Sequence, residues 1–443
     1  MERQYKDSGI EWIGRIPKDW KTCRLKSLGY LYGGLVGKSG NDFDVQDEDM
    51  YSLYIPFTNI FNNDVINPNN LHKVKYIDGD IQNEVNKGDL LFLMSSEDYD
   101  GIGKPSILET SIKQLYLNSF CKGFRIHNKD TYPKYLFYLM ASHFVREQLR
   151  LEAKGFIRIN LRQDKLLCCN LILPPYSEQQ HIADYLDIKC AEIDGLIELQ
   201  EQMIAQLTDY KQSVITEAVT KGLDPNAELV PSGIDWIGEI PKGWCVSVLR
   251  RFATIILGKM LQPNSKSTND TLEQYVCAKD VHFEGLDTSD LKSMYFNDME
   301  KDTYQVKSGD MLVVEGGAGA AGSCILKTEL PNTYIQNSIM IVRPKNDIDI
   351  RYIQYYEFSL VKKGYVDYVC NKATIQHFTK DKLSSMPIPL PPLDEQQSIA
   401  TYLDEKCSEI DSLIALKQQK IEALKEYKKS IIFEAVTGKT VID

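Results

Sequence analysis

The sequence predicts an α+β protein: two mixed α/β domains in a pseudo-twofold tandem repeat, separated by two long helices that form an antiparallel coiled coil. Three observations predict this. A segment near the N-terminus recurs in the middle of the chain, a longer helical segment recurs at the C-terminus, and a weakly matching block lies between them in each half. The chain has 443 residues, more than one hydrophobic core usually organises.

The first repeated segment opens each half of the chain. Ser8–Trp20 reads SGIEWIGRIPKDW and Ser232–Trp244 reads SGIDWIGEIPKGW, an offset of 224 residues. Similarity at such a distance indicates a duplicated unit. We therefore divide the chain into a domain over residues 1–172, a helix segment over 173–222, a second domain over 223–389 and a second helix segment over 390–443.

The second repeated segment closes each half. Leu173–Gly222 and Leu390–Lys439 align without gaps at an offset of 217, with 30 of 50 positions identical. The pair Pro174-Pro175 excludes helix upstream, and Ser177 with Gln180, or Asp394 with Gln397, has the spacing of a capping box. Gly222 and Gly438 are typical helix stops. The segment predicts helices over Ser177–Lys221 and Asp394–Thr437.

Apolar residues in both predicted helices recur at steps of three and four, which is typical of a coiled-coil seam. Polar Gln200, Lys417 and Lys420 interrupt it. A helix of about 40 residues is roughly 60 Å long and cannot bury such a stripe on itself. The partner is either a separate protein or the other copy, and two near-identical stripes in one chain favour the second. The predicted seam consists of Ile193, Leu196, Met203, Leu207, Tyr210 and Val214, then Ile410, Leu413, Leu424, Tyr427 and Ile431, with a second edge of Ile197, Ile204, Ile414 and Ile421.

The blocks between the repeats read as mixed α/β. Short apolar stretches such as DLLFLMSS, CKGFRIHN, MLVVEGG and SIMIVRP predict strands, and residues 133–153 and 350–369 predict helices. The two blocks match weakly: GDLLFLMSS at Gly88 corresponds to GDMLVVEGG at Gly309, and LNSF at Leu117 corresponds to IQNS at Ile335.

The sequence indicates neither a catalytic site nor a metal site. Gly317–Gly322 fits G-x-G-x-x-G, but a strand-like stretch follows where a dinucleotide site needs a helix. We interpret it as a loop of small residues that lets the backbone approach a ligand. NLILPPY at Asn170 is similar to an adenine methyltransferase motif, yet the second copy reads LPPL. Glu97, Asp98 and Asp100 cluster, but the second half has only Glu315 nearby.

The charge distribution leaves room for a polyanion partner despite a net charge of −11. The two helix segments carry −9 of it, and Arg146, Arg150, Lys154, Arg158, Arg162 and Lys165 lie within twenty residues of each other. Basic side chains bind phosphates, and Asn, Gln and Arg read base edges; the alternative is a solvated helix face. The candidate DNA contacts are Lys104, Lys154, Arg158, Arg162, Asn371, Lys372, Thr374 and Gln376.

The order of SGIEWIGRIPKDW, a variable block and LPPYSEQQHIADYLD before a long helix, found twice, resembles the specificity subunit of type I restriction-modification enzymes. The resemblance covers essentially the whole chain. It implies that each block is a target recognition domain for one half of a bipartite site in double-stranded DNA, and that the helices hold the two domains apart.

The resemblance also implies the partners. Two methyltransferase subunits, which bind S-adenosylmethionine and methylate adenine, would dock on the chain, and two motor-nuclease subunits would join them. ATP and magnesium are expected on these partners, and no cofactor is expected on this chain. We expect docking on the helices, through Gln179, Gln180, Tyr185, Gln396, Gln397 and Tyr402.

Two other classes of function stay open at this point: a self-sufficient DNA methyltransferase or nuclease, and a coiled-coil scaffold that does not bind DNA. We expect a cytoplasmic protein without a membrane partner. The chain has no apolar run of the roughly 18 residues that span a membrane, its first residues lack the apolar core of a signal peptide, and its ten cysteines contain no C-x-x-C pair.

Overall fold

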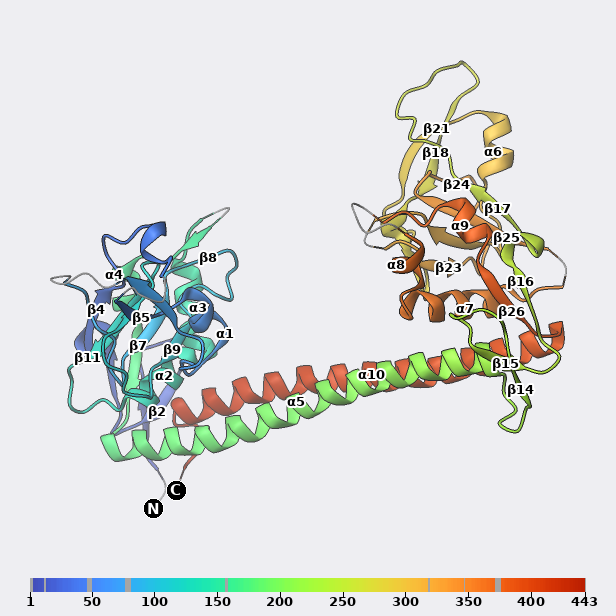
Figure 1. Cartoon of the computed structure of the whole chain (residues 1–443). Coiled ribbons are helices and arrows are strands. Elements are labelled where there is room, and N and C mark those ends of the chain that lie inside the picture. Colours follow the sequence, from blue (N-terminus) through green and yellow to red (C-terminus); the bar gives the residue numbers. More distant parts are fainter. Residues whose placement is uncertain are drawn as a thin grey trace. The chain divides into compact units, whose positions relative to one another are not determined.

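The computed structural model describes residues 3–11, 13–45, 50–75, 81–155, 158–317, 319–345, 347–370 and 376–442. The chain forms two compact units. Unit 1 comprises Met1–Gln200 and Gln419–Asp443, and unit 2 comprises Glu201–Gln418. Each unit therefore contains one domain, the beginning of one long helix and the end of the other (Figure 1).

The two long helices confirm the prediction to within one residue at each end. Helix α5 spans Tyr176–Lys221 and helix α10 spans Leu393–Val436. Gly222 and Gly438, just beyond their ends, have φ values of 76° and 68°, a left-handed conformation that glycine adopts without strain. None of the described helices has the length and apolarity of a membrane span.

The helices pair in antiparallel fashion within each unit. In unit 1, Lys428 of α10 donates to both carboxylate oxygens of Asp194 of α5, at 2.7 Å each. In unit 2, Lys211 of α5 donates to both oxygens of Asp411 of α10, at 2.8 and 2.7 Å. Asp411 is the counterpart of Asp194, and Lys428 is the counterpart of Lys211, each at an offset of 217 residues. The two helices therefore make the same contact twice.

The predicted seam was partly wrong. Ile193, Ile410, Ile421 and Ile431 are buried as expected, but Leu196 and Leu413 are 44% and 47% exposed. Tyr210 and Tyr427 also face solvent, whereas Gln200 is buried. Steps of three and four fit two neighbouring rows on a helix, and the position of the partner helix decides which row is covered. Gln200 therefore belongs to the buried row of α5, although it was expected to interrupt the seam. The row that contains Leu196 and Tyr210 is exposed.

Each domain is built on a four-stranded antiparallel sheet with a smaller three-stranded sheet beside it. In unit 1 the strand orders are β4-β11-β7-β9 and β10-β5-β6. The elements are β1 Tyr5–Asp7, β2 Arg15–Pro17, β3 Lys21–Arg24, β4 Gly29–Gly33, β5 Tyr51–Ile55, α1 Phe57–Asn62, β6 His72–Lys75, β7 Leu90–Leu93, β8 Ser95–Ser96, β9 Pro105–Ile107, β10 Leu115–Leu117, β11 Cys121–Ile126, α2 Pro133–Ala141, α3 His143–Glu152, β12 Ile159–Asn160, α4 Gln163–Leu167 and β13 Asn170–Leu173, with short 3-10 helices at Leu25–Ser27 and Gly40–Asp42.

Unit 2 repeats this topology with the orders β17-β25-β22-β23 and β21-β18-β24. The elements are β14 Leu229–Pro231, β15 Glu239–Pro241, β16 Cys245–Val248, β17 Ala253–Leu257, β18 Thr271–Val276, β19 Val281–His282, β20 Gly285–Leu286, β21 Lys292–Phe296, α6 Asp298–Tyr304, β22 Met311–Val314, β23 Ser323–Ile325, β24 Thr333–Ile335, β25 Ile339–Pro344, α7 Ile350–Lys362, α8 Tyr365–Val369, α9 Lys380–Ser384 and β26 Pro387–Leu390, with 3-10 helices at Leu249–Arg251 and Ala278–Asp280.

The predicted strands are present, and each of the two predicted helices after the main sheet is divided into two. Extended Ser142 separates α2 from α3, and left-handed Gly364 separates α7 from α8. The core of unit 1 runs from Phe92 and Phe124 of the sheet through Tyr135 to α5 and to Val436 of α10. Domain and paired helices therefore share one hydrophobic core, and unit 2 has the equivalent core.

The repeated opening segments connect each domain to both long helices. Trp20 is fully buried, and its indole N–H donates to Glu178 Oε2 in the first turn of α5 at 2.9 Å. Trp244 donates to Glu395 Oε2 in the first turn of α10 at 3.1 Å. The strand after each tryptophan, β3 or β16, pairs with the strand that leads into the helix, β13 or β26.

Two equivalent tyrosines bind the end of the other helix. The Tyr135 hydroxyl lies 3.1 Å from Ile172 O and 3.3 Å from Val436 O at the end of α10. The Tyr352 hydroxyl lies 2.7 Å from Pro389 O and 3.1 Å from Val219 O near the end of α5. The repeated sequence thus forms a junction that joins one domain to the start of one helix and the end of the other.

Candidate nucleic-acid interface

A short hairpin before α4 carries two exposed basic residues of unit 1, Lys154 and Arg158. Lys154 and Asn160 exchange both backbone hydrogen bonds, at 3.0 and 2.9 Å, and Arg158 lies in the turn between them. A Cβ on Gly155 would come 2.0 Å from Arg158 O, so the turn requires glycine there. The returning strand β12 pairs with β8, so the hairpin is attached to the extension of β7 from the main sheet.

An exposed aromatic residue lies against this hairpin. Phe120 belongs to the turn between β10 and β11, and its backbone N–H donates to the side chain of Asn118 at 2.9 Å. The ring is 57% exposed, and the Arg158 guanidinium lies 5.2 Å from its centroid. No motif in the sequence predicted a functional role for Phe120. The turn LNSF, which matches IQNS in the second half, could have indicated it, because a large apolar residue such as Phe120 is unusual in a polar turn.

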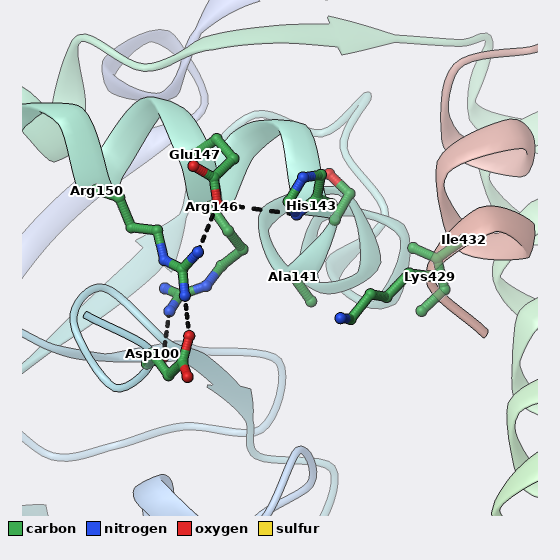
Figure 2. Close-up of a pocket in the computed structure, with 9 residues that line it drawn as sticks. Asp100, Ala141, His143, Arg146, Glu147, Arg150, Lys429 and Ile432 are labelled. Carbon is green, nitrogen blue, oxygen red and sulfur yellow. Dashed lines mark hydrogen bonds and ion pairs between the residues drawn. The ribbon is translucent and has the colours of Figure 1, made fainter. Parts of the chain in front are cut away.

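Two arginines of the basic stretch hold the loop between β8 and β9. Arg146 donates to Ile102 O and to Asp100 O, both at 2.6 Å, and burial lowers the pKa of its guanidinium to about 10. Arg150 pairs with Asp100, and with Glu147 at 2.6 Å. Figure 2 shows both guanidinium groups pointing toward Asp100 at a cavity that Lys429 of α10 also lines. These arginines stabilise the loop.

Other predicted contacts have partners inside unit 1. Lys104 Nζ donates to Phe61 O at 2.6 Å and lies 3.5 Å from Asp64. Arg162 makes two bonds of 3.0 Å to Asp164, and Lys165 pairs with Glu152 at 2.6 Å. Lys154 and Arg158 are exposed and make no ion pair with a carboxylate in the described parts of the chain. All four predicted contacts, Lys104, Lys154, Arg158 and Arg162, stay predictions.

Unit 2 places polar residues at the equivalent position. Gln376 O accepts a bond from Gly317 N at 3.1 Å, and Phe378 N donates to Glu315 O, as Leu161 N does to Met94 O in unit 1. The Gln376 side chain donates to Asp367 at 2.5 Å. The predicted contacts Asn371, Lys372 and Thr374 lie outside the described residues.

The glycine-rich motif Gly317–Gly322 joins two adjacent antiparallel strands, β22 and β23. The strand expected after it is therefore confirmed, and no helix begins in the described part of the motif. Ala321 has a φ of 64°, matching the φ of 65° at Gly103 in unit 1. Of the acidic cluster, Asp98 accepts the N–H of Gly101 at 2.6 Å. In the described ranges, no three His, Cys, Asp or Glu side chains are grouped so as to hold a metal ion.

Two predicted docking residues are buried and bonded within their own units. Gln179 is buried, accepts a bond from Tyr132 N at 2.8 Å and donates to Asp130 O and Pro174 O at 2.8 and 2.9 Å. Gln396 is buried and binds Asp349 N and Pro391 O at 2.9 Å each. Because both ends of each amide bind the surrounding backbone, these residues position the helix start, and their part in docking stays a prediction.

The other docking candidates have accessible surface. Gln397 is exposed, and Gln180 is partly exposed. Tyr185 and Tyr402 are half-buried against the cores of units 1 and 2. Their role in docking stays a prediction.

The chain thus consists of two copies of one α/β framework, each joined to a pair of helices and each with a polar or basic strand connection at the same place. This arrangement is that of a two-domain binding protein, and the basic hairpin of unit 1 fits a nucleic acid. Comparison with known proteins narrows this class. Residues 17–209 and 241–426 match the family described as "Type I restriction modification DNA specificity domain". The chain belongs to this family and is a specificity subunit of a type I restriction-modification system, with two DNA-recognition domains in tandem.

Relatives align over nearly the whole chain. The MjaVIII type I restriction enzyme specificity subunit of Methanocaldococcus jannaschii is 26% identical over 440 residues, covering 96% of this chain and 94% of the relative. The EcoKI specificity subunit of Escherichia coli is 19% identical over 444 residues, covering 96% and 90%.

Solved structures show the same fold. A chain from a study of complex assembly and conformational transition of the type I R-M system has a TM-score of 0.74 at 17% identity, covering 96% of this chain and 99% of its own. The HsdS subunit from Thermoanaerobacter tengcongensis has a TM-score of 0.54 at 17% identity, covering 96% and 98%.

Proposed function

We propose that each unit reads one half of a bipartite target in double-stranded DNA, and that the chain directs adenine methylation or restriction by partner subunits to that target. The observation that carries this proposal is the contrast between framework and surface. The junctions around Trp20 and Trp244 repeat the same bond from the indole to a glutamate of the helix start. Arg158 in unit 1 and Gln376–His377 in unit 2, by contrast, occupy corresponding connections with different chemistry.

The proposal assigns the chemistry to the partners. S-adenosylmethionine, ATP and magnesium would bind the methyltransferase and motor-nuclease subunits, and this chain would supply recognition. The acidic residues considered for a nuclease support this assignment, because Asp98 caps its own loop and Asp100 pairs with Arg150. We expect the complex to act in the cytoplasm.

The outer faces of α5 and α10 supply docking surfaces that carry the same residue types on both helices. Leu196, Leu199 and Tyr210 of α5 are exposed, and their counterparts Leu413, Leu416 and Tyr427 of α10 are exposed too. Apolar side chains repeated on one helix face are typical of a surface that a partner helix covers. Together with the predicted docking residues Gln180, Tyr185, Gln397 and Tyr402, they would bind two methyltransferase subunits in equivalent ways, and two motor-nuclease subunits would join that complex.

Mapping methylated adenines in cells with and without this gene tests the proposal. A bipartite motif should disappear with the gene. Replacing residues 21–170 by the corresponding block of a relative should then change one half-site and preserve the other. A motif in which both halves change, or neither, would contradict the assignment of one half-site to each unit.

A second test concerns affinity. Lys154 is an exposed residue of the hairpin, and we expect it to contact a phosphate. Lys154→Ala should weaken binding to all DNA sequences alike and lower the slope of log affinity against log salt by about one. Lys6→Ala, which changes an exposed lysine of β1, is the control. Equal salt slopes for both variants would assign Lys154 to a solvated surface.

A further inference from the structure

The Arg158 side chain differs from the neighbouring cations of the basic stretch in what holds it. Arg150, Arg162 and Lys165 each pair with a carboxylate, and Arg146 is buried against backbone carbonyls. Arg158 instead lies over the exposed ring of Phe120. Its guanidinium charge is therefore not neutralised by an acid in the described part of unit 1.

The Phe120 ring contacts the guanidinium without occupying its N–H groups. A guanidinium is planar and stacks on an aromatic face, while its donors remain in its own plane at the edges. A carboxylate partner would occupy those donors, as Asp164 does with Arg162. The contact with Phe120 thus leaves the guanidinium donors available to a ligand.

The connection that carries Arg158 is fixed to the main sheet. Asn160 pairs with Ser95, and Cys121, next to Phe120, pairs with Leu93 of β7. The hairpin and the turn with Phe120 therefore start from adjacent strands, near β8 in Figure 1. Side chains held on a rigid framework lose little entropy on binding, which favours specific recognition.

The chemistry of this pair fits a base edge better than a phosphate. A phosphate can also accept paired bonds from a guanidinium, but the apolar ring of Phe120 would displace water that solvates the phosphate oxygens. In the major groove, a guanine presents two acceptors, O6 and N7, that an arginine binds with two parallel bonds, and neighbouring thymine methyl groups are apolar.

We propose that Arg158 reads a guanine in the half-site recognised by unit 1, and that Phe120 is the positioning residue that holds its guanidinium in the reading orientation. This inference rests on the proposed function. It goes further because it assigns one base pair of the target to one side chain. Arg158 can prove not to read a guanine even if the chain does recognise a bipartite target.

The experiment uses the full chain co-expressed with its methyltransferase subunits in a strain lacking other methyltransferases. The wild-type methylated motif is mapped first. The purified complex is then titrated with duplexes that carry this motif and with duplexes in which each base pair is changed in turn. The variants are Arg158→Ala, Arg158→Lys, Phe120→Leu and Phe120→Trp, and Arg15→Ala at an exposed position of β2 is the control.

Arg158→Ala should abolish discrimination at one G·C pair of one half-site, a loss of roughly 5- to 150-fold, and leave the other half-site unchanged. Arg158→Lys should lose it as well, because an ammonium lacks the paired donors. Phe120→Leu should lower discrimination at the same pair by about 2- to 5-fold, and Phe120→Trp should preserve it.

Three outcomes would overturn the inference. A uniform loss of affinity across all duplexes with a lower salt slope would make Arg158 a phosphate contact. Unchanged binding in every variant, with unchanged melting temperatures, would assign the pair to an idle surface. If Arg158→Ala lost discrimination at one base pair but Phe120→Leu did not, Phe120 would have no positioning role. A wild-type chain that directs no bipartite methylation would instead overturn the proposed function itself.

Discussion

Replacing Trp20 by alanine removes the side chain at the centre of the junction in unit 1. Trp20 is fully buried, Arg3 lies over its ring at 5.6 Å, and its N–H binds Glu178. Truncating a buried tryptophan typically costs about 3–5 kcal/mol, which is a large share of the roughly 5–15 kcal/mol that stabilises a domain. We expect Trp20→Ala to destabilise unit 1 by about 3–5 kcal/mol.

Trp20→Phe separates packing from the hydrogen bond. Phenylalanine retains most of the apolar surface and lacks the indole donor. A hydrogen bond to a charged group contributes about 1.5–3 kcal/mol, and Glu178 also pairs with Arg3. Because the carboxylate retains that partner, we expect the loss for Trp20→Phe near the lower end of this range.

Native-state hydrogen exchange read by mass spectrometry measures each unit separately. Amides of β11 report on unit 1 and amides of β25 on unit 2. Trp20→Ala should lower protection in β11 much more than in β25, and Trp244→Ala should do the reverse, because each tryptophan belongs to the core of its own unit. Equal losses in both units, or a loss below about 1 kcal/mol for Trp20→Ala, would refute the view that the repeated segments lock each domain to its helix ends.

Three further predictions concern the helix ends, a buried glutamate of unit 2 and the length of the two helices. Gly438→Ala should destabilise the chain more than Gly222→Ala in chemical denaturation. Both glycines have a positive φ, but a Cβ at 438 would lie 2.7 Å from Pro17, whereas a Cβ at 222 would be 3.2 Å from its nearest atom. Equal losses of stability would contradict this. Burial raises the pKa of Glu357 to about 8. The folded state therefore binds the extra proton, and the stability of unit 2 should fall as pH rises from about 4.5 to about 8. Glu357→Met should remove this slope in melting curves, and an unchanged slope would assign it to other groups. Inserting seven residues at matching levels of α5 and α10 keeps the seam in phase and adds about 10.5 Å of helix, or about three base pairs. The methylated motif should then have a longer spacer, and a folded, active variant with the original spacer would limit the helices to subunit docking.

Local signals in the sequence determined the large divisions of this protein. The duplication, the α+β class and the bounds of α5 and α10 follow from residues close together in the chain: Pro174-Pro175 before a helix, glycine after it, and apolar residues every three or four positions. These features act through backbone sterics and helix periodicity, which are properties of neighbouring residues. The breaks at Ser142 and Gly364 escaped prediction because the apolar pattern continues across them.

Tertiary structure alone decided which side of each helix is covered and which polar groups are available. Gln179 resembles a surface residue in sequence, yet it is buried because the backbone at Asp130 and Tyr132 folds over it. Among similar cations, Arg150 meets Asp100 from another loop, while Arg158 meets Phe120, 38 positions earlier in the chain. Such pairings depend on how distant strands come together in the sheet, and the charge of a side chain gives no information about the partner that it finds there.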